Sequence, residues 1–379
     1  MNIDELPDDC LLLIFNLFNN FETLLNCSEV CKRWENLVLK RLHSVKYLTN
    51  SSERDAYPAN YTMFFKEDDP LEKYRISILL PRLRILDIAG RFKLKPWAVF
   101  PAKGLQFNSW DEYLEDFTFY IPGIEMIAAS HCYNFFANDV QGPKLTQLFI
   151  SHCDVSQFAS IAKYFPNLKR LHIEDLNTCY PDEDKCYTGP VLEKLEILEV
   201  SICVEWGDVN RYYGLSLADH CPALKSAYHV IPVDEPYVNS EIENHDLEDL
   251  VLLLGCDWST LRRILSKYPN LKHLAIRGGT LITDENIPEL LKILPCIILI
   301  DVRDSGSVTE KSTEYIHWYC EHHNRSISLY YKDDETEIKK KWPNLSTQRV
   351  HIGRGFDFMK YCFPLKHHEN LPYLLDPDE

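Results

Sequence analysis

Leucine and other aliphatic residues recur along the chain in a frame that repeats from residue 80 onward. The frame reads Pro-x-Leu-x-x-Leu-x-Leu, with looser copies, and most of its steps are roughly 21 to 29 residues long. The stretches that carry it are 80–88, 121–132, 142–153, 165–176, 191–203, 221–230, 245–256, 268–279, 294–305 and 342–352. This period predicts a repeat protein in which each copy forms one structural unit.

Each copy of the frame predicts a short strand, because Leu-x-x-Leu-x-Leu ends in a two-residue alternation that buries one face. Helical patterns lie between the strands, for example at 155–165 and 286–294, and each ends before a proline that stops it. One strand and one helix cannot close a core, so the copies must stack. We therefore expect an α/β fold: a curved leucine-rich solenoid with parallel strands on its concave face and helices on its convex face.

The frame is unclear in two places and changes at both ends. Residues 89–120 hold an insert or a degenerate repeat, and 306–341 are irregular. We expect about ten repeats over 80–352, after a linker and N-terminal cap at 46–79. The tail at 353–379 is rich in aromatic residues and proline, and it either caps the last repeat or folds back toward the concave face.

The first 45 residues follow a different pattern, with apolar positions at helical spacing. Pro7 suits the first turn of a helix, and Asp8 and Asp9 suit the positive end of its dipole. Three short helices are predicted, and together they are too small to bury their apolar residues alone. These residues therefore either form a partner surface or pack against the rest of the chain.

This N-terminal pattern closely resembles the F-box motif. Its Leu-Pro, Ile-Phe, Leu-Leu and Val-Cys-Lys-x-Trp elements occur in the order and spacing of that family. The resemblance implies that residues 1–45 are an F-box, which docks onto a Skp-type adaptor and through it onto the cullin and RING subunits of a ubiquitin ligase. The residues that would form or support this adaptor interface are Leu6, Pro7, Ile14, Phe15, Leu24, Val30, Cys31 and Trp34.

The repeats resemble the cysteine-containing class of leucine-rich repeat. Cys153 follows the last aliphatic residue of its frame, Ile150, by three positions, and Cys132 and Cys203 are placed equivalently. The stretch at 282–302 also resembles that class. The resemblance implies that these cysteines turn the chain inside each coil and are structural.

Charge and composition narrow the kinds of partner and compartment. The formal net charge is -17, whereas nucleic-acid binding needs clustered lysine and arginine, and no apolar run reaches the roughly 18 residues of a membrane span. The apolar N-terminal run has an acidic flank, unlike a secretory signal. The 13 cysteines include no Cys-x-x-Cys pair and do not suit a disulfide framework. We expect no nucleic acid, no membrane and no secretion, but a cytoplasmic and/or nuclear protein.

Two clusters have residue types that occur in active sites. His152-Cys153-Asp154 contains the groups of a nucleophilic triad, but chain neighbours rarely have triad geometry. His317, Cys320, His322 and His323 could ligate a metal, but they lack paired cysteine spacing. We therefore predict no catalytic residue, no metal and no cofactor, and leave an enzyme that uses the histidine cluster as a third hypothesis.

The residues between the buried aliphatic positions of each strand should line the concave wall. Phe149, Ile197, Tyr228 and Val251 are apolar at positions expected to face solvent. The candidate substrate-facing residues are Phe149, Arg170, His172, Ile197, Tyr228, Val251, His273 and Arg277.

The sequence thus favours a non-catalytic substrate-recognition subunit of an SCF-type ubiquitin ligase. Its helices would bind the adaptor, and its repeats would hold a protein substrate near the conjugating enzyme, which promotes ubiquitination and proteasomal degradation. The alternative is a binding scaffold that holds the adaptor but whose partner is not ubiquitinated.

Overall fold

The structure is a computed structural model of the chain. The residues that it describes are 3–50, 57, 59–66, 74–89, 102–108, 124–129, 142, 144–175, 185–202, 211–231, 233, 236–278, 282–303, 305–332 and 373–374. They form two compact units, one holding the described residues from 3 to 129 with 373–374, the other those from 142 to 332. Cys132, Cys203 and the repeat at 342–352 lie outside the described residues.

Three short helices begin the first unit, as the sequence predicts. After a 3-10 turn at Ile3–Glu5 they are α1 (Asp8–Leu17), α2 (Phe21–Ser28) and α3 (Lys32–Leu42). Asn20 caps α2, because its side chain accepts a hydrogen bond of 2.8 Å from the backbone N–H of Thr23. Lys40 and Arg41 lie in the last turn of α3, where positive charge interacts favourably with the helix dipole.

Five parallel strands follow in the first unit, in the spatial order β5-β4-β3-β1-β2. The elements are β1 (Tyr47–Thr49), a 3-10 turn (Ala59–Tyr61), β2 (Thr62–Phe64), α5 (Ile76–Leu79), β3 (Ile85–Ala89), β4 (Gly104–Asn108) and β5 (Met126–Ala129). Strands β1 and β2 lie within the predicted linker and cap at 46–79. Strand β4 lies within 89–120, where the sequence frame is unclear.

The second unit is a run of parallel strands in which spatial order equals chain order, from β6 to β13. Its strands are β6 (Gln147–Ser151), β7 (Arg170–Asp175), β8 (Ile197–Ile202), β9 (Ser226–Ile231), β10 (Asp249–Leu254), β11 (His273–Arg277), β12 (Leu299–Asp301) and β13 (Ser328–Tyr330). Its helices are α6 (Val155–Ile161), a 3-10 turn (Ala162–Tyr164), α7 (Gly214–Ala218), α8 (Trp258–Leu265), α9 (Ile287–Ile293) and α10 (Glu310–His323).

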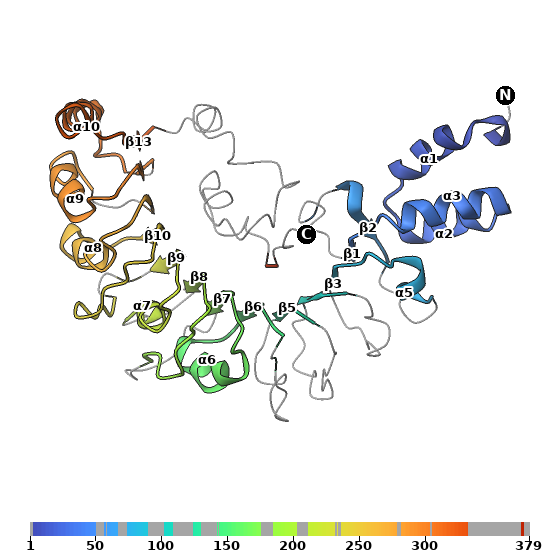
Figure 1. Ribbon diagram of the computed structural model, residues 1–379, viewed down its shortest axis with the longest axis horizontal. Coiled ribbons are helices and arrows are strands. Elements are labelled where there is room, and N and C mark those ends of the chain that lie inside the picture. The colour runs from blue at the N-terminus through green and yellow to red at the C-terminus, as the bar shows by residue number, and fades with distance from the viewer. Residues whose placement is uncertain are drawn as a thin grey trace. The chain divides into compact units, whose positions relative to one another are not determined.

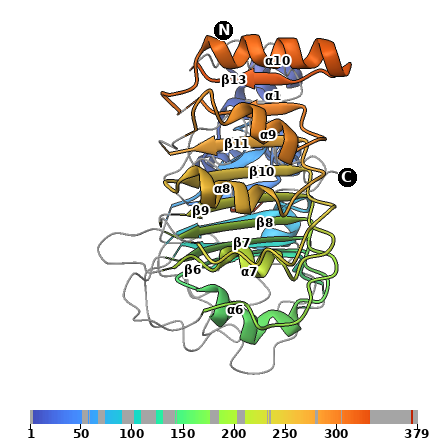
Figure 2. The ribbon, with the colours of Figure 1, turned by 90° about the vertical axis from the view of Figure 1, so that its left-hand side faces the viewer.

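The helices of the second unit lie along one side of its strands (Figure 1). Seen from the side, these strands lie parallel to one another in a single stack (Figure 2). Strands β6 to β12 each contribute a buried apolar residue to the layer between strands and helices, as at Leu148, Leu171, Leu198, Leu250 and Leu274. The expected fold class, short helices followed by a solenoid of parallel strands with helices on one side, is confirmed.

We call the opposite side of the strands, which carries the residues between these core positions, the inner face. Adjacent strands are in register, so that equivalent residues form rows across it. One row contains Phe149, His172, Glu199, Tyr228, Val251, Ala275, Asp301 and Tyr330. The preceding row contains Gln147, Arg170, Ile197, Ser226, Asp249, His273, Leu299 and Ser328.

Helix α10 is fixed to an earlier turn by Asp284. The Asp284 carboxylate accepts hydrogen bonds from the Ser312 hydroxyl (2.5 Å), the Thr309 hydroxyl (2.7 Å) and the Thr309 backbone N–H (2.8 Å). The bonds from Ser312 and Thr309 lower the pKa of Asp284 to about 2. The carboxylate therefore contributes to the attachment of α10 in its charged form.

We predict that this attachment weakens in acid. A carboxylate whose pKa is depressed on folding contributes stability above its unfolded pKa of about 3.9, and this contribution is lost as the pH falls toward 2. Hydrogen exchange of the α10 amides between pH 5 and pH 2.5 should accelerate in the wild type beyond its intrinsic pH dependence. Asp284→Asn should remove most of this extra pH dependence, whereas Asp246→Asn, at an exposed turn, should keep it. Equal profiles for all three proteins would contradict the assignment.

Candidate protein-binding surfaces

Large apolar side chains are exposed on the N-terminal helices. The exposed fractions are 45% for Ile3, 66% for Leu13, 82% for Leu17 and 60% for Val30. Leu13 and Leu17 are one helical turn apart on α1, and the exposed Cys10 lies one turn before Leu13. Exposed apolar side chains that share one helix face, as Cys10, Leu13 and Leu17 do, make this helix a candidate protein-interaction surface.

The sequence-predicted interface residues divide into a surface set and a supporting set. Pro7, Val30 and Cys31 are exposed, and Leu6 and Ile14 are half-buried. The supporting residues lie inside the three-helix unit and are Phe15, Leu24 and, in part, Trp34.

Trp34 supports the helices through an edge-to-face contact. Its ring centroid lies 5.2 Å from that of Phe15, at an interplanar angle of 71°. Sequence reasoning missed Leu13 and Leu17, because α1 is apolar nearly all round and periodicity does not show which side faces outward.

Arg33 holds the N-terminal segment against α3. Its Nε donates to Asp8 Oδ1 at 2.7 Å, and its Nη2 donates to the Leu6 carbonyl at 2.5 Å. These bonds connect the Leu6-Pro7 dipeptide to the same helix that carries Trp34. The segment just before α1 is therefore held against α3.

Charged side chains on the inner face of the second unit pair across strands. Arg170 donates to both carboxylate oxygens of Glu199, at 2.9 and 3.0 Å, and both side chains are buried. Burial raises the pKa of Glu199, and the neighbouring Arg170 opposes that rise. Further along, Asp301 accepts from Arg303 at 3.0 Å and from Arg277 at 2.6 Å.

The apolar inner-face residues are not solvent-exposed. Phe149, Ile197, Tyr228 and Val251 have exposed fractions of only 1 to 4%, so the expectation that these positions face water is wrong. Parallel strands lie about 4.8 Å apart, so side chains of one row cover one another's flanks; the Phe149 ring centroid, for example, lies 4.7 Å from that of His172. Their role in substrate contact stays a prediction.

Ser226, Asp249 and His273 form a hydrogen-bonded line across three strands. Ser226 donates to Asp249 Oδ2 at 2.6 Å, and His273 Nδ1 lies 2.6 Å from Asp249 Oδ1. A nucleophilic serine needs the histidine as its base, with the acid behind it. Here the carboxylate stands in the middle, so this line positions side chains and does not activate the hydroxyl.

The model of the F-box-like family matches residues 3–45, the segment that contains these three helices. Residues 3–45 form an F-box-like domain. The match ends just before β1, so it says nothing of the strands that follow.

Two solved structures that match the chain share little sequence with it. The structure of a Rad7 and Elc1 complex in yeast is 16% identical, covers 87% of this chain and 94% of that chain, and has a TM-score of 0.38. A TLR13–ssRNA13 complex is 15% identical over 67% of this chain and 36% of that chain, also with a TM-score of 0.38. No curated protein matches the sequence.

The F-box-like domain is joined to the β2 segment by backbone and side-chain hydrogen bonds as well as by the chain itself. The Phe64 N–H of β2 donates to the Asn19 carbonyl at 2.6 Å. The Lys66 N–H donates to Glu22 Oε1 at 2.9 Å. The buried Arg41 of α3 donates to the Asn60 carbonyl at 3.1 Å. Helices and strands of the first unit are therefore one packed body.

Cys153 and Asp154 of the His152-Cys153-Asp154 cluster have structural contacts of their own. Cys153 is fully buried, as the repeat frame predicts for a structural cysteine. Asp154 instead caps α6: its side chain accepts from the Gln157 N–H at 2.8 Å and pairs with Lys185 at 2.9 Å. Although burial raises the pKa of Asp154, bonds from Ser156, Lys185 and Gln157 lower it overall.

The histidine cluster lies on α10. His317 pairs with Glu321 at 3.3 Å, the His322 ring contacts the Trp318 ring at a tilt, and the His323 ring stacks on Tyr319. No group of three His, Cys, Asp or Glu side chains in the described parts of the chain is placed to hold a metal ion. Nor is any helix of the described residues long and apolar enough to cross a membrane.

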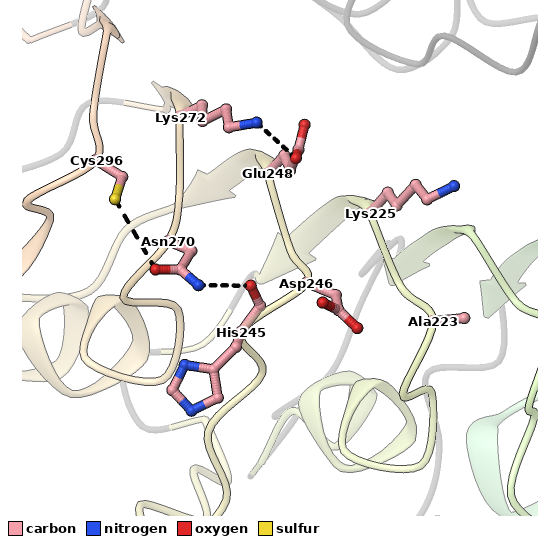
Figure 3. A pocket seen from close by; sticks show the side chains of 8 residues that line it. All are labelled: Ala223, Lys225, His245, Asp246, Glu248, Asn270, Lys272 and Cys296. Atoms are coloured by element: carbon pink, nitrogen blue, oxygen red, sulfur yellow. Dashed lines mark hydrogen bonds and ion pairs between the residues drawn. The ribbon is translucent and has the colours of Figure 1, made fainter.

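A pocket of about 500 Å³ opens at the turns that precede β9 to β12 (Figure 3). Its lining is polar and of mixed charge, and Lys272 pairs there with Glu248 at 2.6 Å. Asn270 donates to the His245 carbonyl at 2.9 Å. The lining residues are Ala223, Lys225, His245, Asp246, Glu248, Asn270, Lys272 and Cys296. Lys225 and Lys272 line it beside Asp246 and Glu248, so charges of both signs face the pocket.

Proposed function

We propose that the chain is a non-catalytic substrate-recognition subunit of an SCF-type ubiquitin ligase. The observation that carries this proposal is the exposed apolar surface of the F-box-like domain, formed by Ile3, Leu13, Leu17 and Val30. This surface would bind a Skp-type adaptor, which would connect the chain to cullin and RING subunits. We further propose that the strand-and-helix repeats that follow this domain in the chain are leucine-rich repeats of the cysteine-containing class.

The proposed mechanism is proximity. The inner face of the repeats would bind a protein substrate, and the complex would hold it close to a conjugating enzyme that is loaded with ubiquitin. Tethering raises the effective concentration of substrate lysines without bond chemistry by this chain. Ubiquitination and proteasomal degradation of that substrate would follow, in the cytoplasm or the nucleus.

The test is capture of a Skp-type adaptor and cullin by the full chain, compared with a Leu17→Asp/Val30→Asp variant. Both side chains are well exposed, so the variant should fold with an unchanged circular dichroism melt. Burying two charges in an apolar interface should weaken adaptor binding by about 100-fold or more. A Val191→Asp/Ile298→Asp variant, with two exposed apolar residues of the second unit, should bind normally.

Two outcomes would change the conclusion. If the adaptor binds neither protein, or binds both equally, the apolar surface of the F-box-like domain serves another purpose. If the adaptor binds but a captured partner receives no ubiquitin from the assembled complex, the chain is a scaffold and not a ligase subunit.

A further inference from the structure

Two exposed segments of the F-box-like domain come from separate parts of the chain. Ile3 and Pro7 precede α1, whereas Val30 and Cys31 precede α3. All four residues are exposed, and the last three lie outside the helices. A partner that contacts both segments at once therefore needs them to be held in a fixed arrangement.

Apolar burial holds the segment before α1 only weakly. Leu6 is half-buried, and the exposed fraction of Ile3 is 45%. Pro7 has no backbone N–H to donate, and as the residue before α1 it makes no side-chain cap. Hydrogen bonds to the other backbone groups of this segment are therefore important for its position.

Arg33 makes such a hydrogen bond from the first turn of α3. Its Nη2 donates to the Leu6 carbonyl at 2.5 Å, and its Nε donates to Asp8 Oδ1 at 2.7 Å. One planar guanidinium thus binds both the backbone before α1 and a carboxylate in the first turn of α1. Because Val30 and Cys31 immediately precede α3, this side chain connects the two exposed segments.

We propose that Arg33 is a positioning residue for adaptor binding, which assembles one binding surface from residues 3–7 and 30–31. This rests on the proposed function, in which the exposed apolar surface of the domain binds a Skp-type adaptor. Arg33 acts through the segment that it orders, and it need not contact the adaptor itself. Without Arg33 the adaptor must order residues 3–7 on binding, and this loss of conformational freedom lowers the affinity.

Loss of the Arg33 contacts should affect binding more than stability. The Arg33 and Asp8 side chains are 38% and 60% exposed, and an exposed ion pair contributes little to folding. Arg33→Met keeps a long side chain but removes the guanidinium, so it should melt like the wild type and bind the adaptor about tenfold more weakly. Lys32→Met removes the same charge one residue earlier, where Lys32 pairs with Glu35 at 2.7 Å within α3, and should bind normally.

A double-mutant cycle on the full chain tests whether Arg33 acts through the segment before α1. Ile3→Asp should weaken adaptor binding in the wild type but have little further effect in Arg33→Met, because Ile3 is then no longer held at the surface. Leu17→Asp, at the last residue of α1, should weaken binding by the same factor in both backgrounds. General destabilisation of the domain would not make the effect of Ile3→Asp depend on Arg33.

Hydrogen exchange tests the positioning without the adaptor. The Leu6 N–H donates to the Ile3 carbonyl within the turn before α1, and the Leu11 N–H donates to the carbonyl of the residue before that helix. Both amides should exchange faster in Arg33→Met than in the wild type. The Leu24 N–H, which donates to the carbonyl of the residue before α2, should exchange at the wild-type rate.

Three results would overturn the role of Arg33 alone, given a wild type that binds the adaptor. They are equal affinities of Arg33→Met and the wild type, an effect of Ile3→Asp that is the same in both backgrounds, and unchanged exchange of the Leu6 and Leu11 amides. A wild type that binds no adaptor would refute the ligase assignment and this inference together. Failure of the inference is therefore distinguishable from failure of the proposed function.

Discussion

Lys267→Met should lower the free energy of unfolding of the second unit by about 3–5 kcal/mol, the cost of leaving a buried charge without its partner. Lys267 Nζ lies 2.7 Å from Asp219 Oδ1, and both side chains are almost fully buried. Nζ also donates to the Asn239 carbonyl at 2.6 Å and to the Ile242 carbonyl at 3.0 Å. Burial raises the pKa of Asp219, and Lys267 opposes that rise.

The chain contains a matched control for this experiment. Lys225 pairs with Glu196 at 3.3 Å on the surface, and its side chain is 61% exposed. Lys225→Met should change stability by less than about 1 kcal/mol, because solvent screens an exposed pair. Urea unfolding followed by circular dichroism, with slopes compared, measures both changes. Equal shifts for the two variants would show that burial of the Lys267 pair carries no special cost.

A second large effect is expected from Phe15→Ala. Phe15 is buried between the helices of the F-box-like domain and packs edge-to-face on Trp34. Removing a buried phenyl ring lowers the free energy of unfolding by about 3–5 kcal/mol. A domain as small as the F-box-like domain has little more stability than that. The variant should unfold α1 to α3, destabilise the strands of the first unit that pack on them, and lose adaptor binding, while the unfolding transition of the second unit is unchanged.

Leu13→Ala, compared with Phe15→Ala, distinguishes a residue that would contact the adaptor from one that stabilises the helices. The same helix holds both residues, but Leu13 is exposed. The Leu13 variant should keep protected amides in α1 to α3 and lose only part of its adaptor affinity. Hydrogen exchange and adaptor capture, measured on both variants, check this pair of outcomes. Protected helices in Phe15→Ala would show that the ring does not support the domain.

The repeating frame predicted strands where its leucines are regular and failed where they are not. The copies at 165–176 and 268–279 became β7 and β11. The three-residue strands β1 and β2 are too short to show an alternation, and β1 pairs with β2 and β3, which both follow it later in the chain. Helix α10 escaped prediction because only Ser312 and Ile316 are buried along it, so no apolar stripe marks it.

The inner-face contacts were beyond sequence reasoning for a different reason. Arg170 and Glu199 belong to separate repeats, and their pairing depends on the register between β7 and β8. A local pattern places each residue on the correct face but not beside its partner.

The hydrogen bonds between the F-box-like domain and the β2 segment affect which lysine of a bound substrate could receive ubiquitin. Because the Asn19 carbonyl accepts a hydrogen bond from β2 and the Asn60 carbonyl accepts one from α3, the helices are fixed to the β2 segment and are not joined to it by the chain alone. If the adaptor grips the helices as proposed, the first unit points in one fixed direction from the ligase. The fixed orientation would then limit which lysines of a bound substrate can reach the conjugating enzyme.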